Sequence, residues 1–205
     1  MIIRTYSNDD ELVSKRRDSI IRSAMTLFLK KGFTQTTTRE IAKACGLSIG
    51  TLYNYIGSKE DLLVLMSKDL VLFSNQYSSV VDEKKRFCNA DEKLYFFMRR
   101  YMEFVNENDD IMLFWYQEAK NLKGEARNIL FSSEKEIITI FEKVLAEGKE
   151  SDEFHVDNTY LMANNIIVIC DMWAFKRYLL RKRFTFDEYV KVQTQLILSQ
   201  IKSAL

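Results

Sequence analysis

Apolar residues recur at helical spacing along most of the chain. In the first such segment, Ile20, Ala24, Leu27 and Phe28 stand at positions i, i+4, i+7 and i+8, the pattern of one buried helical face. The sequence contains no proline and no sustained alternation of apolar and polar residues, so strands are not indicated. We therefore expect an all-α fold. The longer helices are expected at residues 12–31, 59–77, 91–106, 109–122, 125–148, 157–183 and 186–203.

Residues 36–63, TTTREIAKACGLSIGTLYNYIGSKEDLL, depart from this pattern and hold three of the six glycines. Thr37 and Glu40 have the spacing of a capping box, which predicts a helix that runs to about residue 44. Gly46 is suited to the left-handed conformation that ends a helix. Ser48 is a favourable N-cap for a second short helix, to about residue 55. The segment therefore predicts two short helices joined by a tight turn.

The spacing of Ala42, Gly46 and Leu52 allows these two helices to pack closely. A small residue lets the second helix approach, glycine permits the turn, and leucine fills the core between the helices. A DNA-binding helix-turn-helix requires this arrangement, and its second helix enters the major groove. A corner between two helices of any helical protein requires it as well. The small, polar and aromatic residues on the exposed side favour DNA binding.

Residues 19–63 resemble the DNA-binding domain of the TetR family of bacterial transcriptional regulators. The resemblance lies in the helix end LFLKKGF, the threonines before REIAKACG, the pattern S-x-G-T-L-Y-x-Y and the motif SKEDL. Ile56 stands where the family usually has phenylalanine and keeps the position apolar. The resemblance implies an N-terminal three-helix DNA-binding domain with a helix-turn-helix at residues 1–58. It also implies a larger helical ligand-binding and dimerisation domain at residues 59–205.

A member of this family is expected to be a homodimeric repressor that binds a palindromic double-stranded DNA operator, with one helix-turn-helix on each half-site. Residues 48–51 would then face base edges. Tyr53 and Asn54 would meet the DNA backbone or a thymine methyl group, and Lys59 would bind a phosphate. The residues expected to contact DNA are Thr38, Arg39, Ser48, Ile49, Gly50, Thr51, Tyr53, Asn54 and Lys59.

The charge distribution favours a polyanionic partner for the N-terminal region. Residues 1–60 hold ten Lys and Arg against six Asp and Glu, whereas the remaining residues hold 20 against 23. No apolar stretch approaches the roughly 18 residues of a membrane span, and the first residues do not resemble a secretory signal. Cys45, Cys88 and Cys170 are too far apart in sequence for a disulfide framework or a metal-binding motif. We therefore expect a cytoplasmic protein that does not bind a membrane.

No catalytic constellation stands out in the sequence. It has one histidine and lacks the glycine-rich and zinc-binding motifs of nucleotide-dependent enzymes and metalloproteases. His155 stands among acidic residues, but its segment, SDEFHVDN, is more typical of a polar loop in which Asp157 caps the next helix. We therefore expect a protein that is not an enzyme and that holds no metal or cofactor.

Aromatic residues are concentrated in the body of the chain, residues 59–205. Helical packing accounts for most of them, but the polar residues among them favour a pocket for a hydrophobic small molecule. The segments FWYQEAKNL and MWAFKRYLLRKRF resemble parts of the TetR-family regulators that sense fatty acyl-coenzyme A. The cations of the second segment would bind coenzyme A phosphates, or they belong to a solvated helix end. The residues expected to bind the effector are Phe97, Tyr101, Phe114, Trp115, Gln117, Glu118, Asn121, Asn165, Trp173, Arg177 and Arg181.

The last two predicted helices carry long apolar stripes. The family resemblance implies that these stripes pair with those of a second copy in a four-helix dimer interface. Packing within one chain is the alternative. The helix at residues 59–77 would transmit the effector signal to the DNA-binding domain. The residues expected to form the dimer interface are Leu161, Val168, Met172, Val192 and Leu196.

Two alternatives to an acyl-coenzyme A-responsive repressor stay open. One is a repressor that responds to drugs or other aromatic compounds. The other is a helical ligand-binding scaffold without operator function. A rise of affinity with acyl chain length would separate the first alternative from an acyl-coenzyme A sensor, and salt-dependent DNA binding would argue against the second.

Overall fold

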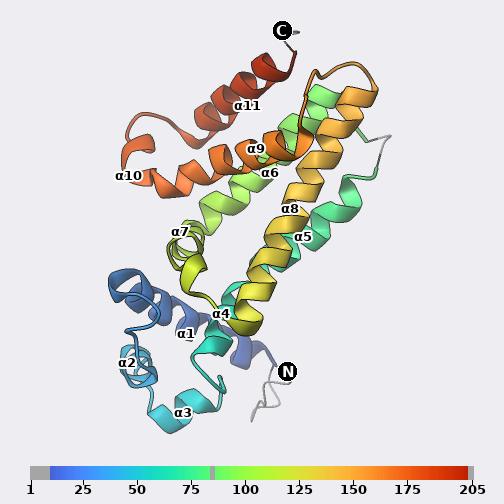
Figure 1. The fold of residues 1–205 in the computed structure, drawn as a ribbon. Helices are drawn as coiled ribbons and strands as arrows, with labels where there is room; N and C mark the ends of the chain where they lie inside the picture. Colours follow the sequence, from blue (N-terminus) through green and yellow to red (C-terminus); the bar gives the residue numbers. More distant parts are fainter. Residues whose placement is uncertain (1–9, 84–85, 203–205) are drawn as a thin grey trace. The chain divides into compact units, whose positions relative to one another are not determined.

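The structure is a computed structural model that describes residues 10–83 and 86–202 (Figure 1). Within these ranges the regular secondary structure is helical, with no strand. The predicted all-α fold is therefore confirmed. None of the helices in these ranges combines the length and the apolar character that a membrane span requires.

The chain folds into two compact units. The first extends to Asp69 and takes up Leu113–Leu130, whereas the second consists of Leu70–Met112 and the residues from Phe131 onward. The boundary predicted between residues 58 and 59 divides DNA binding from effector binding, and that functional division stays a prediction. In the structure, the residues between this boundary and Asp69 belong to the same unit as the helix-turn-helix.

The first unit is built from short helices around a small apolar core. Its N-terminal helices are α1 (Asp10–Lys31), α2 (Thr38–Ala44), α3 (Ile49–Tyr53) and α4 (Glu60–Met66). Later elements that contribute to it are the end of α7 (Asp109–Glu118), the 3-10 helix η1 (Ala119–Asn121) and the start of α8 (Gly124–Glu150). The apolar residues that it buries most completely include Ile20, Ala24, Phe28, Ile41, Leu52, Ile56 and Leu62.

The second unit is a bundle of longer helices, in which α6 packs against both α9 and α11 (Figure 1). Apolar side chains at helical spacing form its core. Its helices, besides most of α8 and the start of α7, are α5 (Lys68–Val80), α6 (Ala90–Glu107), α9 (Thr159–Phe175), α10 (Arg177–Leu180) and α11 (Phe186–Lys202). Its fully buried residues include Leu94, Phe97, Met98, Phe141, Val144 and Ile166.

The single helix predicted at residues 59–77 is wrong, because two helices, α4 and α5, occupy this stretch. They are separated at Ser67, whose ψ of −6° departs from the helical value near −42°. The Ser67 hydroxyl donates a hydrogen bond to the Val64 carbonyl at 2.9 Å. Serine side chains compete in this way for the carbonyls of a helix, but Ser74 forms the same kind of bond with Val71 inside α5 without interrupting it, so the bond alone does not explain the break.

The single helix predicted at residues 157–183 is also interrupted. α9 ends at Phe175, and Lys176 adopts φ −111° and ψ 21°, outside the helical region. The short helix α10 follows, and its Arg177 forms an ion pair with Asp109 of α7. The pattern of apolar residues did not reveal the break, because ion pairs with a distant segment hold α10.

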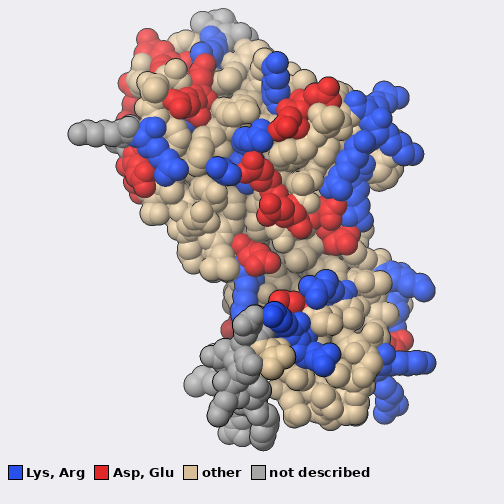
Figure 2. Space-filling view, turned by 180° about the vertical axis from the view of Figure 1, so that it is seen from behind, with Lys and Arg blue, Asp and Glu red and all other residues tan. Residues whose placement is uncertain are grey.

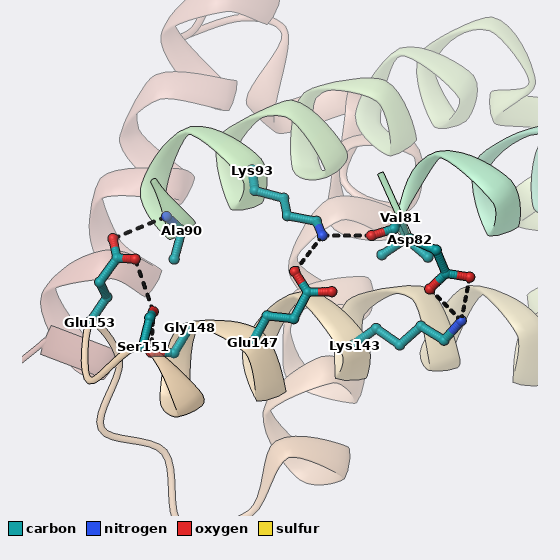
Figure 3. A network of polar contacts seen from close by, with 9 residues as sticks. All are labelled: Val81, Asp82, Ala90, Lys93, Lys143, Glu147, Gly148, Ser151 and Glu153. Atoms are coloured by element: carbon teal, nitrogen blue, oxygen red, sulfur yellow. Dashed lines mark hydrogen bonds and ion pairs between the residues drawn. The ribbon is translucent and has the colours of Figure 1, made fainter. Parts of the chain in front are cut away.

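The loop after α8 is held against the start of α6. Gly148 permits this, because a Cβ atom there would lie 2.1 Å from Cδ2 of Phe154. The adjacent Glu153 accepts a hydrogen bond from the Ala90 N–H at 3.0 Å (Figure 3). A carboxylate is favourable at this place, since the N-terminus of a helix carries partial positive charge.

Candidate DNA-binding interface and effector site

The start of α2 is fixed by the predicted capping box, which is confirmed. The Thr37 side chain accepts a hydrogen bond from the Glu40 N–H at 3.3 Å, and Glu40 Oε2 accepts one from the Thr37 N–H at 2.9 Å. Lys31 donates to the other carboxylate oxygen of Glu40 at 2.6 Å. This hydrogen bond from Lys31, together with those from Thr37, lowers the pKa of Glu40 to about 2. The carboxylate that caps α2 is therefore ionised at neutral pH.

The turn between α2 and α3 has the geometry that the glycine pattern predicts. Gly46 has φ +66°, in the left-handed region that favours glycine. Ser48 caps α3, and its hydroxyl accepts the Thr51 N–H at 3.0 Å. Ala42 and Leu52 are buried, so the two helices share one core. These contacts hold α3 against α2 and leave its opposite side to solvent.

The exposed side of α3 presents both polar and apolar groups. Ile49 and Tyr53 are 41% and 48% exposed, so apolar surface lies beside the polar groups of this helix. The Tyr53 hydroxyl lies 3.4 Å from Thr38 Oγ1, so the first turn of α2 adjoins this surface. The other predicted DNA-contacting residues that are exposed are Arg39, Ser48, Gly50 and Asn54, and Thr51 is half-buried.

Lys59 has a structural role that the sequence analysis missed. Its Nζ donates hydrogen bonds to the carbonyls of Phe33 and Thr36, at 2.8 and 2.9 Å. It also lies 4.2 Å from the centre of the Phe33 ring. The side chain therefore ties the start of α4 to the loop between α1 and α2. An ammonium group has three donors, so these two bonds leave one for a phosphate.

Lys and Arg side chains gather on the first unit in the face that Figure 2 shows, whereas acidic and basic side chains are mixed on the second unit. This agrees with the excess of Lys and Arg in residues 1–60. Lys15, Arg16, Arg39 and Lys43 of α1 and α2 are all exposed. A surface of this kind attracts a polyanion.

The predicted effector-binding residues are divided between the two units. Phe114, Trp115, Gln117, Glu118 and Asn121 belong to the first unit, and the other six belong to the second. The effector-binding role of each residue stays a prediction. Their burial also differs. Those that are buried are Phe97, Tyr101, Phe114, Trp115 and Trp173, and those that are exposed include Gln117, Asn121 and Asn165.

The second unit contains a cluster of aromatic rings with a carboxyl group beside it. Phe73 lies 5.6 Å from Tyr101 and 4.9 Å from Phe104, measured between ring centres. The Tyr101 hydroxyl donates a hydrogen bond to Asp171 Oδ1 at 3.0 Å. Burial raises the pKa of Asp171 to about 7; the negative charge of Glu134 adds to this rise and the Tyr101 hydrogen bond opposes it. Asp171 is therefore a carboxyl group that titrates near neutral pH.

The predicted phosphate-binding arginines already have partners. Arg177 lies 3.0 Å from Asp109 Oδ2 and 2.7 Å from Asp110 Oδ1, and Arg181 lies 2.9 Å from the same Asp109 oxygen. Trp173, also in the predicted set, donates its indole N–H to Asn106 at 2.8 Å. Within the second unit, the two arginines hold α10 and the residue after it to the start of α7, and Trp173 holds α9 to the end of α6. An anionic ligand would have to compete with the two carboxylates.

Two family models match the chain. Residues 20–66 match the one described as bacterial regulatory proteins, tetR family, and residues 88–175 match the one described as Tetracyclin repressor-like, C-terminal domain. The chain belongs to the TetR family. It is a DNA-binding transcriptional regulator, as the sequence analysis predicted.

Relatives of this TetR-family chain are transcriptional regulators. The HTH-type transcriptional regulator HbdR of Aromatoleum sp. (strain CIB) is 26% identical over 207 residues, which cover 98% of this chain and 87% of HbdR. The fold resembles that of FadR from Bacillus subtilis in complex with stearoyl-CoA, with a TM-score of 0.66, 21% identity, and 92% and 98% of the two chains covered. It also resembles AibR in complex with isovaleryl coenzyme A and operator DNA, with a TM-score of 0.72, 22% identity, and 88% and 97% covered.

A cavity of about 390 Å³ lies in the second unit of this TetR-family regulator, beside the start of α6 and the end of α8. Lys93 is on its wall and is only 4% exposed. Its Nζ bonds to the Val81 carbonyl at 2.5 Å and to Glu147 at 2.6 Å (Figure 3). None of the predicted effector-binding residues lines this cavity, so it is not the pocket that the sequence analysis expected.

Several large apolar side chains on α9 and α11 are exposed in the single chain. They include four of the five residues predicted to form a dimer interface, and Met172, the fifth, is half-buried. Soluble proteins seldom leave many such side chains to water without a partner. The exposed large apolar residues on these two helices are Tyr160, Leu161, Val168, Val192 and Leu196.

We expect the stability of the protein to depend on the protonation of Asp171. The folded protein keeps this proton up to about pH 7, whereas the unfolded chain releases it near pH 3.8. The folded state thus binds more protons between these values, so the free energy of unfolding falls as the pH rises, by up to about 1.4 kcal/mol per pH unit. Asp171→Asn has no carboxyl proton to release, so its free energy of unfolding should not show this fall with pH. Urea denaturation at a series of pH values would measure the difference.

The control for this prediction is Asp187→Asn, which removes a well-exposed carboxylate that pairs with Arg99. The difference in unfolding free energy between Asp171→Asn and the wild type should grow from about pH 4 to pH 7, and that of the control should not. A constant difference across this range for Asp171→Asn would contradict the raised pKa.

Proposed function

We propose that the protein is a homodimeric repressor that binds a palindromic operator through α2 and α3 and leaves it when a fatty acyl-coenzyme A binds. The exposed side of α3 carries the DNA-binding part of this proposal. Gly50 brings the backbone of α3 to the surface without a side chain, beside the exposed Ile49 and Tyr53. Apolar groups and an accessible backbone suit contact with thymine methyl groups and base edges in the major groove.

Phosphate contacts are assigned to Arg39 and Lys59. The Arg39 side chain is exposed and has no hydrogen bond or ion pair among the described residues. Lys59 uses two of its donors inside the protein and has one left. Arg39 is therefore expected to serve DNA binding alone, whereas Lys59 serves both folding and DNA binding.

Arg39→Ala should weaken binding to specific and non-specific DNA by a similar factor, because a phosphate contact carries no sequence information. The slope of log affinity against log salt concentration should become shallower by about one unit. Fluorescence anisotropy with labelled duplexes at several salt concentrations would measure both effects. The melting temperature should not change.

Lys59→Ala is the comparison for Arg39→Ala. It should reduce DNA affinity and also lower the melting temperature, since the carbonyls of Phe33 and Thr36 lose their donor. If Arg39→Ala bound DNA with the wild-type salt slope, the proposed phosphate contact would be wrong. Loss of salt-dependent binding in the wild type itself would instead favour a scaffold without operator function.

A fatty acyl-coenzyme A is the proposed effector. Two regulators with a similar fold were solved with coenzyme A thioesters, FadR with stearoyl-CoA and AibR with isovaleryl coenzyme A. The aromatic interior of the second unit suits an acyl chain, and Arg177 and Arg181 suit phosphates. Because both arginines pair with Asp109, the phosphates must displace the Asp109 carboxylate or share the arginines with it.

Affinity for acyl-coenzyme A should rise with chain length until the pocket is full, because each buried methylene contributes about 0.8 kcal/mol. Asp109→Asn should strengthen thioester binding, since Arg177 and Arg181 then lose a competing carboxylate. Calorimetry across a series of chain lengths would measure both effects. Asp187→Asn, which breaks a different surface ion pair, is the matched control and should bind like the wild type. A flat series would rule out an acyl-coenzyme A sensor.

A repressor of the drug- or aromatic-responsive kind is the second candidate, and one observation favours it. Asp171 places a carboxyl group at the aromatic cluster, where it accepts a hydrogen bond from Tyr101, and this environment suits a cationic or hydrogen-bonding aromatic compound. Such a ligand would show no dependence on acyl length, and Asp171→Asn would weaken its binding. The same calorimetric series, extended to cationic dyes, separates the two candidates.

The homodimer is assigned to the exposed apolar surface of α9 and α11. An isologous contact would cover these side chains in both copies with the same surface. Leu161, Val168, Val192 and Leu196 are each about half exposed in the single chain, which supports this assignment. The two helices of each copy would then form a four-helix interface.

Leu196→Glu should convert the dimer into folded monomers, because it places a charge in an apolar interface at a cost of several kcal/mol. Light scattering measures the mass, and circular dichroism confirms that the helices remain. Lys191→Glu puts the same side chain on another exposed part of α11 and should stay dimeric. A dimer that survives Leu196→Glu would place the interface elsewhere.

A further inference from the structure

The cavity beside α6 and α8 belongs to a single compact unit, and its walls are fixed by the fold. Every residue that lines it lies in the second unit, and its volume of about 390 Å³ is that of a small-molecule site. Glu153 on its wall accepts hydrogen bonds from the Ala90 N–H at 3.0 Å and the Ser151 hydroxyl at 2.9 Å. The buried Phe154 lies against Gly148. These contacts hold the loop after α8, so the cavity is formed without a ligand.

The wall of this cavity already binds one ammonium group. Lys93 is 4% exposed, and its Nζ donates to the Val81 carbonyl and to Glu147 Oε2 (Figure 3). The same Nζ lies 5.8 Å from the centre of the Phe87 ring. Burial disfavours a charged lysine, so these groups compensate for the water that the ammonium has lost. A carboxylate, a carbonyl and an aromatic face make this wall suited to ammonium groups.

Carboxylates outnumber cations on this wall. Among the described residues that line the cavity, Lys93 is the one cation, against Glu147, Glu150 and Glu153. Lys93 binds only one oxygen of Glu147, and Glu150 has no hydrogen bond or ion pair among the described residues. Glu147 and Glu150 stand three residues apart on α8 and therefore share a face of the helix. Two negative charges are thus in excess, and oxygens of two carboxylates are available.

An anion and a metal ion both fit this wall less well than an organic cation. The N-terminus of α6 would attract an anion, but Glu153 already accepts the Ala90 N–H there. The hydrogen bond of Cys88 with the Glu92 carboxylate, and the charge of that carboxylate, raise the pKa of the Cys88 thiol, so the thiol stays neutral. In residues 10–83 and 86–202, no three acidic, histidine or cysteine side chains are grouped as a metal ion requires.

We propose that this cavity binds a small aliphatic diamine. Its two ammonium groups balance the two excess carboxylates, with Glu147 and Glu150 as acceptors. The short hydrocarbon between the ammonium groups lies against the apolar part of the wall, formed by Phe87, Ala90 and Val144. None of the predicted effector-binding residues lines the cavity. The diamine is therefore a second ligand, and its binding does not depend on the proposed acyl-coenzyme A.

Calorimetry on the full-length protein with 1,4-diaminobutane tests this proposal. The diamine should bind about fivefold more tightly than 1-aminobutane, which has the same chain with one ammonium group, because a second ion pair is formed. Butanedioate, a dianion of the same length, should not bind. The proposal is wrong if the diamine does not bind, or if butanedioate binds more tightly, since Lys93 would then be the group that attracts the ligand.

A glutamate variant tests the role of the carboxylates. Glu150→Gln should weaken diamine binding about fivefold through the loss of one ion pair. Glu136→Gln makes the same change of charge elsewhere on α8, outside the cavity, and should bind like the wild type. Both residues are exposed, so both variants should fold, which circular dichroism checks. Equal weakening by the two variants would mean that the overall charge of the protein attracts the diamine, which contradicts a specific site.

A variant that fills the cavity gives a readout without any change of charge. Cys88 lines the cavity and is exposed, so Cys88→Trp should occupy part of the cavity without disturbing the core. It should weaken diamine binding at least about tenfold, whereas Cys88→Ser is the control and should bind like the wild type. The diamine should raise the melting temperature of the wild type and of Cys88→Ser, but not that of Cys88→Trp. Unchanged binding in Cys88→Trp would place the diamine outside the cavity and overturn the proposal.

Discussion

The close approach of α2 and α3 is the constraint on which the DNA-binding surface depends. Gly46 turns the chain with φ +66°, and the buried Ala42 and Leu52 then fill the space between the helices. The capping groups at Thr37 and Ser48 define where each helix begins. Because α3 is so short, it cannot be stable alone, and its packing on α2 determines which residues it exposes. The recognition surface follows from this packing.

Several basic residues bind groups of the protein itself. Lys59 binds two carbonyls, Lys93 binds Glu147, and Arg177 binds Asp109 and Asp110. A cation in such a position is already oriented, so little conformational entropy is lost when a phosphate arrives. At Arg177 the proposed phosphate must also compete with Asp109 and Asp110. The proposed anion binding there is an exchange of partners, whereas the two hydrogen bonds of Lys59 leave it one donor for a phosphate.

α7, like α8, has its two ends in different compact units. In the second unit, Asp109 of its first turn pairs with Arg177 and Arg181. In the first unit, Phe114 near its end stacks on Phe28 of α1, and Glu118 accepts a hydrogen bond from the Phe33 N–H. The helix predicted at residues 59–77 is interrupted at Ser67, and its role in transmitting the effector signal stays a prediction.

Local sequence by itself determined the helical class, the capping box, the turn at Gly46 and the family, because these depend on neighbouring residues and on the spacing of apolar positions. Only the tertiary structure decided the partners of the side chains. Trp115 and Trp173 look alike in sequence, yet one indole is satisfied by a residue 67 positions away and the other has no acceptor among the described residues. Lys59 and Arg177 likewise find partners far along the chain. Such contacts form only when distant segments meet, and no local pattern encodes them.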